Sequence, residues 1–153
     1  MQTLYTISVY VHVLAACAWV GSMVFFAAVV VPVLRRPEQA SAAAALVRQV
    51  GMRYRVFGWA CLGLLVTTGT TNLALRGVRL DTLASGAFWA DGFGRALAHK
   101  LGAVALVLVL TAVHDALATR PEARRIGSWL GRATLLASFL VVLYAVWLVR
   151  GTP

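Results

Sequence analysis

Four long apolar runs constrain the fold more than any other feature of this sequence. They cover about residues 5–34, 56–75, 96–118 and 133–149. A helix rises about 1.5 Å per residue and the hydrocarbon core of a bilayer is about 30 Å thick, so runs of this length suit membrane crossing. The sequence therefore predicts a single transmembrane domain, residues 1–153, that crosses the bilayer four times.

The composition supports this interpretation. Hydrophobic residues make up 61% of the chain and charged residues 12%, and the mean hydropathy is +0.82. Soluble domains are nearer one quarter charged. The predicted fold class is therefore all-α, an integral membrane four-helix bundle with antiparallel, up-down-up-down helices.

The connections between the runs differ in character. Residues 35–55 are rich in arginine and alanine, which predicts an interfacial or extended helical segment. Residues 76–95 hold glycines, aromatic residues and two acids, a mixture that suits the headgroup zone or a loop folded over the bundle. Pro32 is expected to kink the first span and Pro121 to stop the third.

The basic residues lie mainly at the ends of the apolar runs. Lysine and arginine number 14 against 5 acids, a net charge of +9. Because of their placement, we expect lipid phosphates and not nucleic acid as their partners. Nine basic residues fall on the side of the first and third connections and five on the other, so the positive-inside rule predicts both termini outside. Cys17 and Cys61 fall in opposite halves of the membrane, and no disulfide is expected.

Polar side chains from all four runs are expected at one depth, in the outer half of the membrane. Ionisable groups in hydrocarbon are costly, so such a layer indicates a functional site. The candidate cofactor-binding residues are His12, His99, Lys100, Thr68, Asn72, Tyr144 and Arg95.

Two histidines facing each other inside a bundle are typical of a b-type haem site. We expect His12 and His99 as axial ligands and Lys100, Arg95 and the outer Thr and Asn groups near the propionates. Copper is the alternative, because imidazole suits that metal. His114 is a third candidate metal ligand, but it lies roughly 22 Å along the helix from His99 and cannot share one metal with it. A packing or interfacial role stays open for each histidine and for the threonines.

Three segments resemble the copper-resistance D (CopD-like) membrane proteins. They are HVLAACAWVGSMVFFAAVVVPVLR, RYRVFGWACLGLLVTTGTTNL and HKLGAVALVLVLTAVHD. The shared pattern is a His followed seven residues on by Trp-x-Gly, an Arg-rich start of the second span with Thr-Gly near its end, and Lys-Leu opening the third. This resemblance implies a role in copper handling in the bacterial inner membrane.

The chain also resembles the HemJ-type protoporphyrinogen oxidases, through His12 before Trp19 and through the pair Lys100 and Leu101. Those proteins are four-helix relatives that bind haem and use the His and the Lys. The resemblance thus implies haem binding at His12 and a supporting role for Lys100.

The leading hypothesis is an inner-membrane, cytochrome b-like protein that transfers single electrons between a membrane quinol or porphyrin donor and an acceptor at the outer face. The haem would carry that chemistry. The alternatives are copper binding or transport with a periplasmic copper partner, a HemJ-like oxidase, and a structural partner subunit. Homo-oligomers are compatible with each, and no catalytic residue is assigned.

Overall fold

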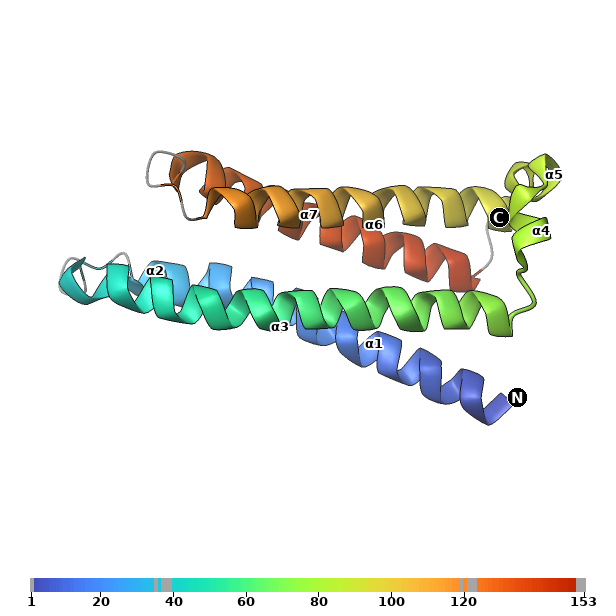
Figure 1. Cartoon of the computed structure of the whole chain (residues 1–153), viewed down its shortest axis with the longest axis horizontal. Coiled ribbons are helices and arrows are strands. Elements are labelled where there is room, and N and C mark those ends of the chain that lie inside the picture. The colour runs from blue at the N-terminus through green and yellow to red at the C-terminus, as the bar shows by residue number, and fades with distance from the viewer. Residues whose placement is uncertain (1, 35, 37–39, 119, 121–123, 151–153) are drawn as a thin grey trace. The chain divides into compact units, whose positions relative to one another are not determined.

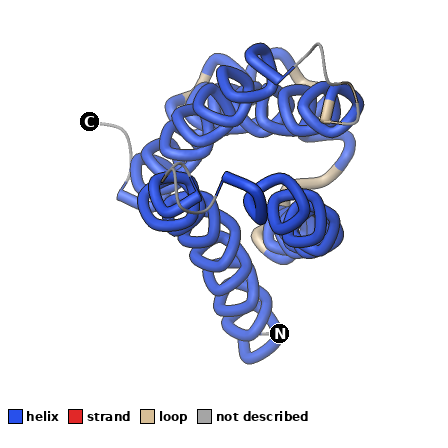
Figure 2. Tube along the Cα trace, turned by 90° about the vertical axis from the view of Figure 1, so that its left-hand side faces the viewer, coloured by secondary structure: helices blue, strands red, loops and turns tan. Residues whose placement is uncertain are grey.

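The computed structural model describes residues 2–34, 36, 40–118, 120 and 124–150, and within these ranges the chain forms helices and loops but no strand (Figure 2). Among the described residues, four helices are long and apolar enough to cross a membrane: Gln2–Leu34, Gln49–Leu75, Gly92–Leu117 and Arg125–Val149. The predicted all-α class of a multi-pass membrane protein is confirmed. The chain divides into two compact helix pairs, residues 1–77 and 78–153, and each is described by itself.

The first pair consists of two long, antiparallel arms. One arm runs through α1 (Gln2–Phe25), the π-helix η1 (Phe26–Val30) and α2 (Val31–Leu34), and the other is α3 (Ala40–Leu75) (Figure 1). On α1 the buried residues are Ser8, Ala15 and Trp19, which recur at helical spacing and so define one face. That face packs on α3.

α3 begins well before the predicted second span. The Ala-rich stretch after Ala40 continues without a break into the apolar run, so the helical interpretation of residues 40–55 is confirmed. Alanine has the highest helix propensity, which explains why this polar, arginine-containing segment remains helical.

The π-helix lies directly before Pro32. Proline lacks an N–H and its ring crowds the carbonyl four residues earlier, here that of Ala28. The N–H of Val31 bonds to the carbonyl of Phe26, five residues back, so the helix widens by one residue at this point. The kink predicted at Pro32 stays a prediction, and what the structure has is a π-helix that ends at Val30, two residues before the proline. Pro121, predicted to stop the third span, lies outside the described residues.

The second pair is formed by two long, antiparallel helices, α6 (Gly92–Leu117) and α7 (Arg124–Arg150) (Figure 1). Two short helices, α4 (Leu80–Ala84) and α5 (Gly86–Ala90), precede them in the chain. Small residues of α7 are almost fully buried, among them Thr134, Ala137 and Ser138. The two hydroxyls donate to carbonyls one turn back in their own helix, to Leu130 and Thr134, at 2.8 Å each. Small residues of this kind allow membrane helices to pack closely.

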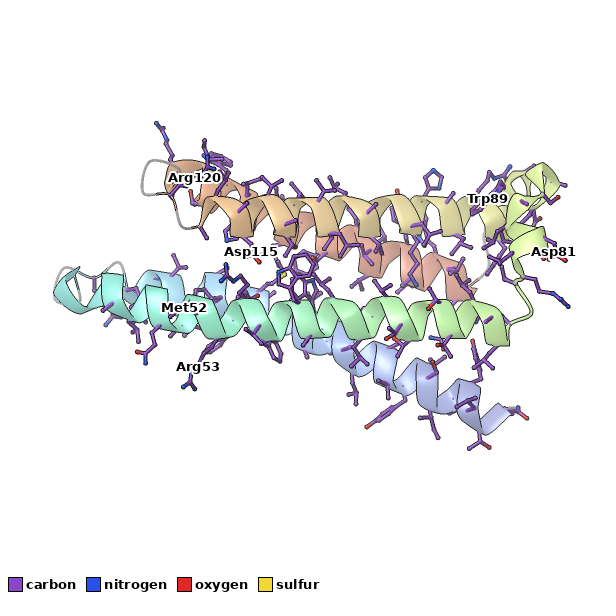
Figure 3. All side chains as sticks on the ribbon, viewed as in Figure 1. Met52, Arg53, Asp81, Trp89, Asp115 and Arg120 are labelled. Atoms are coloured by element: carbon purple, nitrogen blue, oxygen red, sulfur yellow. The ribbon has the colours of Figure 1, made fainter. Side chains whose placement is uncertain are left out.

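The predicted loop 76–95 is largely helical. The indole N–H of Trp89 donates to the Leu83 carbonyl at 2.8 Å and so joins α5 to α4. Asp91 caps α6, its side chain accepting from the Phe93 N–H at 3.4 Å, and the third span therefore starts at Gly92, before the predicted residue 96. Figure 3 shows Asp81 and Trp89 at this end of the pair, with Asp115 and Arg120 toward the other end of α6.

The long helices expose many large apolar side chains. The exposed fraction is 71% for Val56, 63% for Tyr10 and 66% for Leu136. In water such surfaces would associate, whereas in a bilayer they face lipid tails. The pattern agrees with a membrane environment for these helices.

Candidate functional site

A polar cluster lies between α1 and α3 in the first helix pair. We call it the His12 cluster; it comprises Ser8, His12, Thr68 and Asn72. His12 Nδ1 lies 2.8 Å from Thr68 Oγ1, and Ser8 Oγ lies 3.5 Å from the Thr68 carbonyl oxygen. His12 follows Ser8 by four residues and therefore shares the face of α1 that packs on α3.

The hydrogen bond to Thr68 determines which nitrogen of neutral His12 carries the proton. A threonine hydroxyl has one hydrogen, and Thr68 Oγ1 donates it to the Leu64 carbonyl at 2.6 Å. With that hydrogen given to Leu64, Thr68 Oγ1 accepts from His12, and this assigns the proton of a neutral ring to Nδ1. The lone pair of the neutral ring consequently lies on Nε2, the arrangement found in histidines that bind metals.

Two further residues of α3 shape this cluster. A Cβ added at Gly69 would lie 3.3 Å from His12 Cε1, so the glycine lets the imidazole approach the helix closely. One turn after Thr68, the Asn72 Oδ1 atom is buried and has no hydrogen-bond partner within the described residues. A buried amide oxygen without a donor is costly, which makes it a candidate contact for a bound group.

The neighbouring threonines behave differently from Thr68. Thr67, Thr70 and Thr71 each donate to a carbonyl of their own helix, at Gly63, Val66 and Thr67 respectively, at 2.8 to 3.0 Å. All three are exposed. Thr68 also bonds its own helix, but of these four threonines it is the one that is half-buried and within hydrogen-bond distance of His12.

In the second helix pair His99 and Tyr144 come together. Their rings stack with centroids 5.6 Å apart and planes 13° apart, and Trp147 meets Tyr144 edge-on at 5.7 Å. His99 and Arg95 are exposed and one turn apart on α6, whereas Lys100 is half-buried. The predicted grouping of His99 and Tyr144 is therefore present as an aromatic stack.

His114 lies at the other end of α6. A Cβ added at Gly131 of α7 would be 3.7 Å from its Cε1 atom. Its Nδ1 atom and the Thr111 hydroxyl one turn earlier are buried and lack partners within the described residues. Because α6 is one continuous helix, His99 and His114 remain far apart and cannot share a ligand.

The metal-ligand hypotheses remain predictions. Within the part of the chain that the structure describes, no three His, Cys, Asp or Glu side chains gather into a metal-binding group. The pairing of His12 with His99 joins residues of the two helix pairs, which are described separately, so it also stays a prediction.

One member of this site, Ser8, was not predicted. It is 8% exposed and lies one turn before His12. The i, i+4 spacing of Ser8 and His12 was the signal that could have found it. The close approach of Gly69 depends on the register of α1 against α3, which spacing along one helix does not determine.

The helices and this polar cluster define an all-α, multi-pass membrane protein. Residues 14–126 match the model of a family described as a domain of unknown function (DUF4149), and the chain belongs to this family. An uncharacterized protein of Aquifex aeolicus (strain VF5) is 31% identical over an alignment of 143 residues that covers 90% of each chain. No solved structure matches the chain. His12 and Tyr144 lie outside the residues that the family model matches.

Proposed function

We propose that this chain is a haem b-binding, cytochrome b-like membrane protein of the CopD-like type, with His12 as an axial ligand. The observation that carries the proposal is the hydrogen bond from His12 Nδ1 to Thr68. It orients the imidazole ring, as the partners of metal-binding histidines do.

The residues of the first helix pair fit such a group in two respects. His12 supplies an imidazole, and Gly69 gives its ring room against α3. Within a bilayer, where little water reaches such groups, polar contacts of this kind are stronger than in water. A bound haem would supply one-electron chemistry, and the protein would set its potential and access.

His99 is proposed as the second axial ligand, and Lys100 and Arg95 as partners of the propionates. The stack of His99 on Tyr144 fixes the plane of its imidazole within the second helix pair. Lys100 is half-buried on α6, and such a position suits a cation that pairs with a carboxylate within the membrane.

We place the protein in the bacterial inner membrane, with both termini outside and a quinol or porphyrin as the expected electron donor. The charge bias of the connections supports this orientation. The outer half of the membrane then holds the His12 cluster.

An absorption spectrum of the protein purified from membranes tests the proposal. We expect a Soret band, a sharp visible band on reduction, and about one haem per chain by extraction. Colourless protein with about one bound copper per chain would contradict the haem assignment and support the copper alternative. Colourless, metal-free protein would favour a structural partner role.

A further inference from the structure

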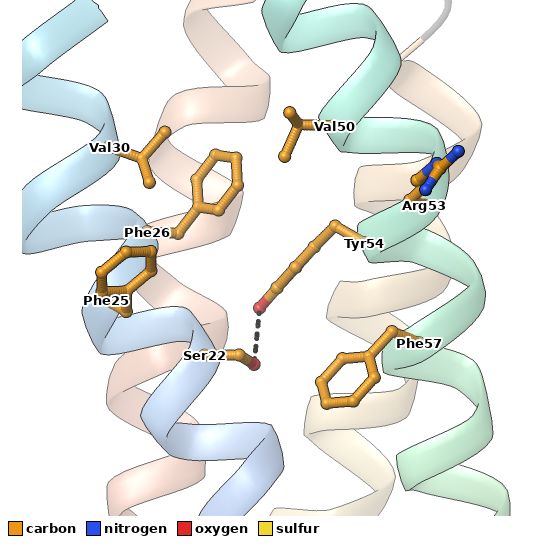
Figure 4. A pocket seen from close by; sticks show the side chains of 8 residues that line it. All are labelled: Ser22, Phe25, Phe26, Val30, Val50, Arg53, Tyr54 and Phe57. Atoms are coloured by element: carbon orange, nitrogen blue, oxygen red, sulfur yellow. Dashed lines mark hydrogen bonds between the residues drawn. The ribbon is translucent and has the colours of Figure 1, made fainter.

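A groove of about 340 Å³ opens between the two arms of the first helix pair, away from the His12 cluster. It is lined by residues from the end of α1, from η1 and from the first half of α3: Ser22, Phe25, Phe26, Val30, Val50, Arg53, Tyr54 and Phe57 (Figure 4). The volume equals about ten groups the size of a water molecule, each of which occupies about 30 Å³ in the liquid. It suits part of a hydrocarbon chain.

The polar groups in the floor of this groove need no hydrogen bond from a ligand. The Ser22 hydroxyl donates to the Trp19 carbonyl at 2.8 Å and lies 3.4 Å from the Tyr54 hydroxyl, so the two hydroxyls are bonded within the protein. Phe26 packs against the Tyr54 ring at 5.2 Å between centroids. The lining is thus aromatic and aliphatic, and it offers little to the polar ring of a quinone.

The π-helix forms one wall of the groove. Phe26 and Val30 are its first and last residues, and both line the groove. The extra residue per turn displaces these side chains from the positions of a regular helix. Such widened turns occur frequently at functional sites in helices.

One basic residue, Arg53, is among the described residues that line the groove. It is exposed and lies about one turn inside the start of the span Gln49–Leu75. That position corresponds to the headgroup depth of a bilayer, where an arginine meets lipid phosphates. The exposed residues Arg36 and Arg55 are near the same end of the helix pair and add to the positive charge there.

We infer that this groove is a binding site for one anionic phospholipid, with an acyl chain between η1 and α3 and the phosphate on Arg53. An apolar floor, a cation at headgroup depth and a net positive chain are complementary to such a lipid in shape and charge. The site is independent of the haem proposal, since it uses none of the same residues.

Native mass spectrometry of the whole protein in detergent, titrated with dioleoyl phosphatidylglycerol or dioleoyl phosphatidylcholine, tests this inference. We expect the wild type to retain one phosphatidylglycerol more tightly than phosphatidylcholine. Arg53→Gln should weaken phosphatidylglycerol binding about five-fold, the effect of one basic residue on an anionic lipid. Val50→Phe, which fills the groove with its charge unchanged, should weaken binding of both lipids.

Arg55→Gln is the matched control, because Arg55 is equally exposed and close in sequence but does not line the groove. It should weaken phosphatidylglycerol binding much less than Arg53→Gln does. Equal losses from Arg53→Gln and Arg55→Gln would mean diffuse attraction to surface charge and would overturn the site. Unchanged binding in Val50→Phe, equal retention of the two lipids by the wild type, or a tightly held isoprenoid quinone would overturn it as well.

Discussion

The orientation of the His12 ring depends on the direction in which the Thr68 hydroxyl points its hydrogen. Its donation to the Leu64 carbonyl leaves the hydroxyl oxygen as the acceptor for His12 Nδ1. A serine can reproduce this arrangement, whereas a valine, which has nearly the same shape, cannot. The role of Thr68 can therefore be separated from its volume.

We expect Thr68→Val to lower haem affinity about ten-fold or more, because loss of a residue that orients a ligating histidine has effects of this size. Thr68→Ser should restore binding. Titration of the haem-free protein with haem, followed by absorption, measures the difference. Thr70→Val is the control, because the Thr70 hydroxyl bonds its own helix and is exposed. Equal losses at positions 68 and 70 would show a general effect on α3.

The sequence predicted His12, Thr68 and Asn72 as polar residues at one depth, because depth follows from distance along a helix. It did not predict that Thr68 alone among its neighbours faces the histidine. Which threonine faces His12 depends on the rotation of α3 about its axis, and a run of consecutive threonines does not determine that rotation. The π-helix is a similar case, because Pro32 predicts that the regular helix is disturbed but not that the disturbance is a π-helix.

Packing of α1 on α3 depends on a close contact between a tryptophan and a glycine. A Cβ added at Gly58 would lie 2.7 Å from Trp19 Cζ3, closer than carbon atoms approach. Trp19 is 5% exposed, so its rigid ring has little freedom to move aside. At Gly63, five residues later on the same helix, no atom would lie within 4 Å of an added Cβ.

We therefore expect Gly58→Ala to destabilise the protein by about 1–3 kcal/mol, as is usual for overpacking. Each kcal/mol corresponds to a loss of about 2–4 °C in Tm for a chain of this size. Gly63→Ala should be neutral or slightly stabilising, because alanine is the better helix former. Thermal unfolding in detergent, followed by circular dichroism, compares the two. Similar Tm values for both variants would contradict the predicted contact.

Hydropathy alone predicted which long helices form, but not the residues at which they begin. The four apolar runs predicted the four long helices, but every helix begins before its apolar run, and α3 and α7 do so by the largest margins. Helix formation depends on propensity and capping as well as on hydropathy, as the alanines of α3 and the Asp91 cap of α6 show. The short helices α4 and α5 were missed because tertiary contacts such as the Trp89 bond to Leu83 stabilise them.

For the whole molecule, the distribution of basic residues predicts the orientation in the membrane. Nine lie on the predicted inner side and five on the outer side. The exposed connection around Ser85, between α4 and α5, is then outside. The connection that follows the third span is then inside.

Cysteine labelling of intact cells tests this orientation. In a background without Cys17 and Cys61, we expect Ser85→Cys to react with a membrane-impermeant maleimide. Glu122→Cys should react only after the membrane is opened. The reverse pattern would place the His12 cluster in the inner half of the membrane and would contradict the proposed outer site.

The haem content of two histidine variants tests the proposed function most directly. His12→Ala removes the oriented imidazole, and His114→Ala removes a histidine at the far end of α6. Reduced-minus-oxidised spectra of the purified proteins should show no haem in His12→Ala, a return of the bands when imidazole is added, and full haem in His114→Ala. Full haem in His12→Ala, or equal loss in both variants, would contradict a cofactor held by His12.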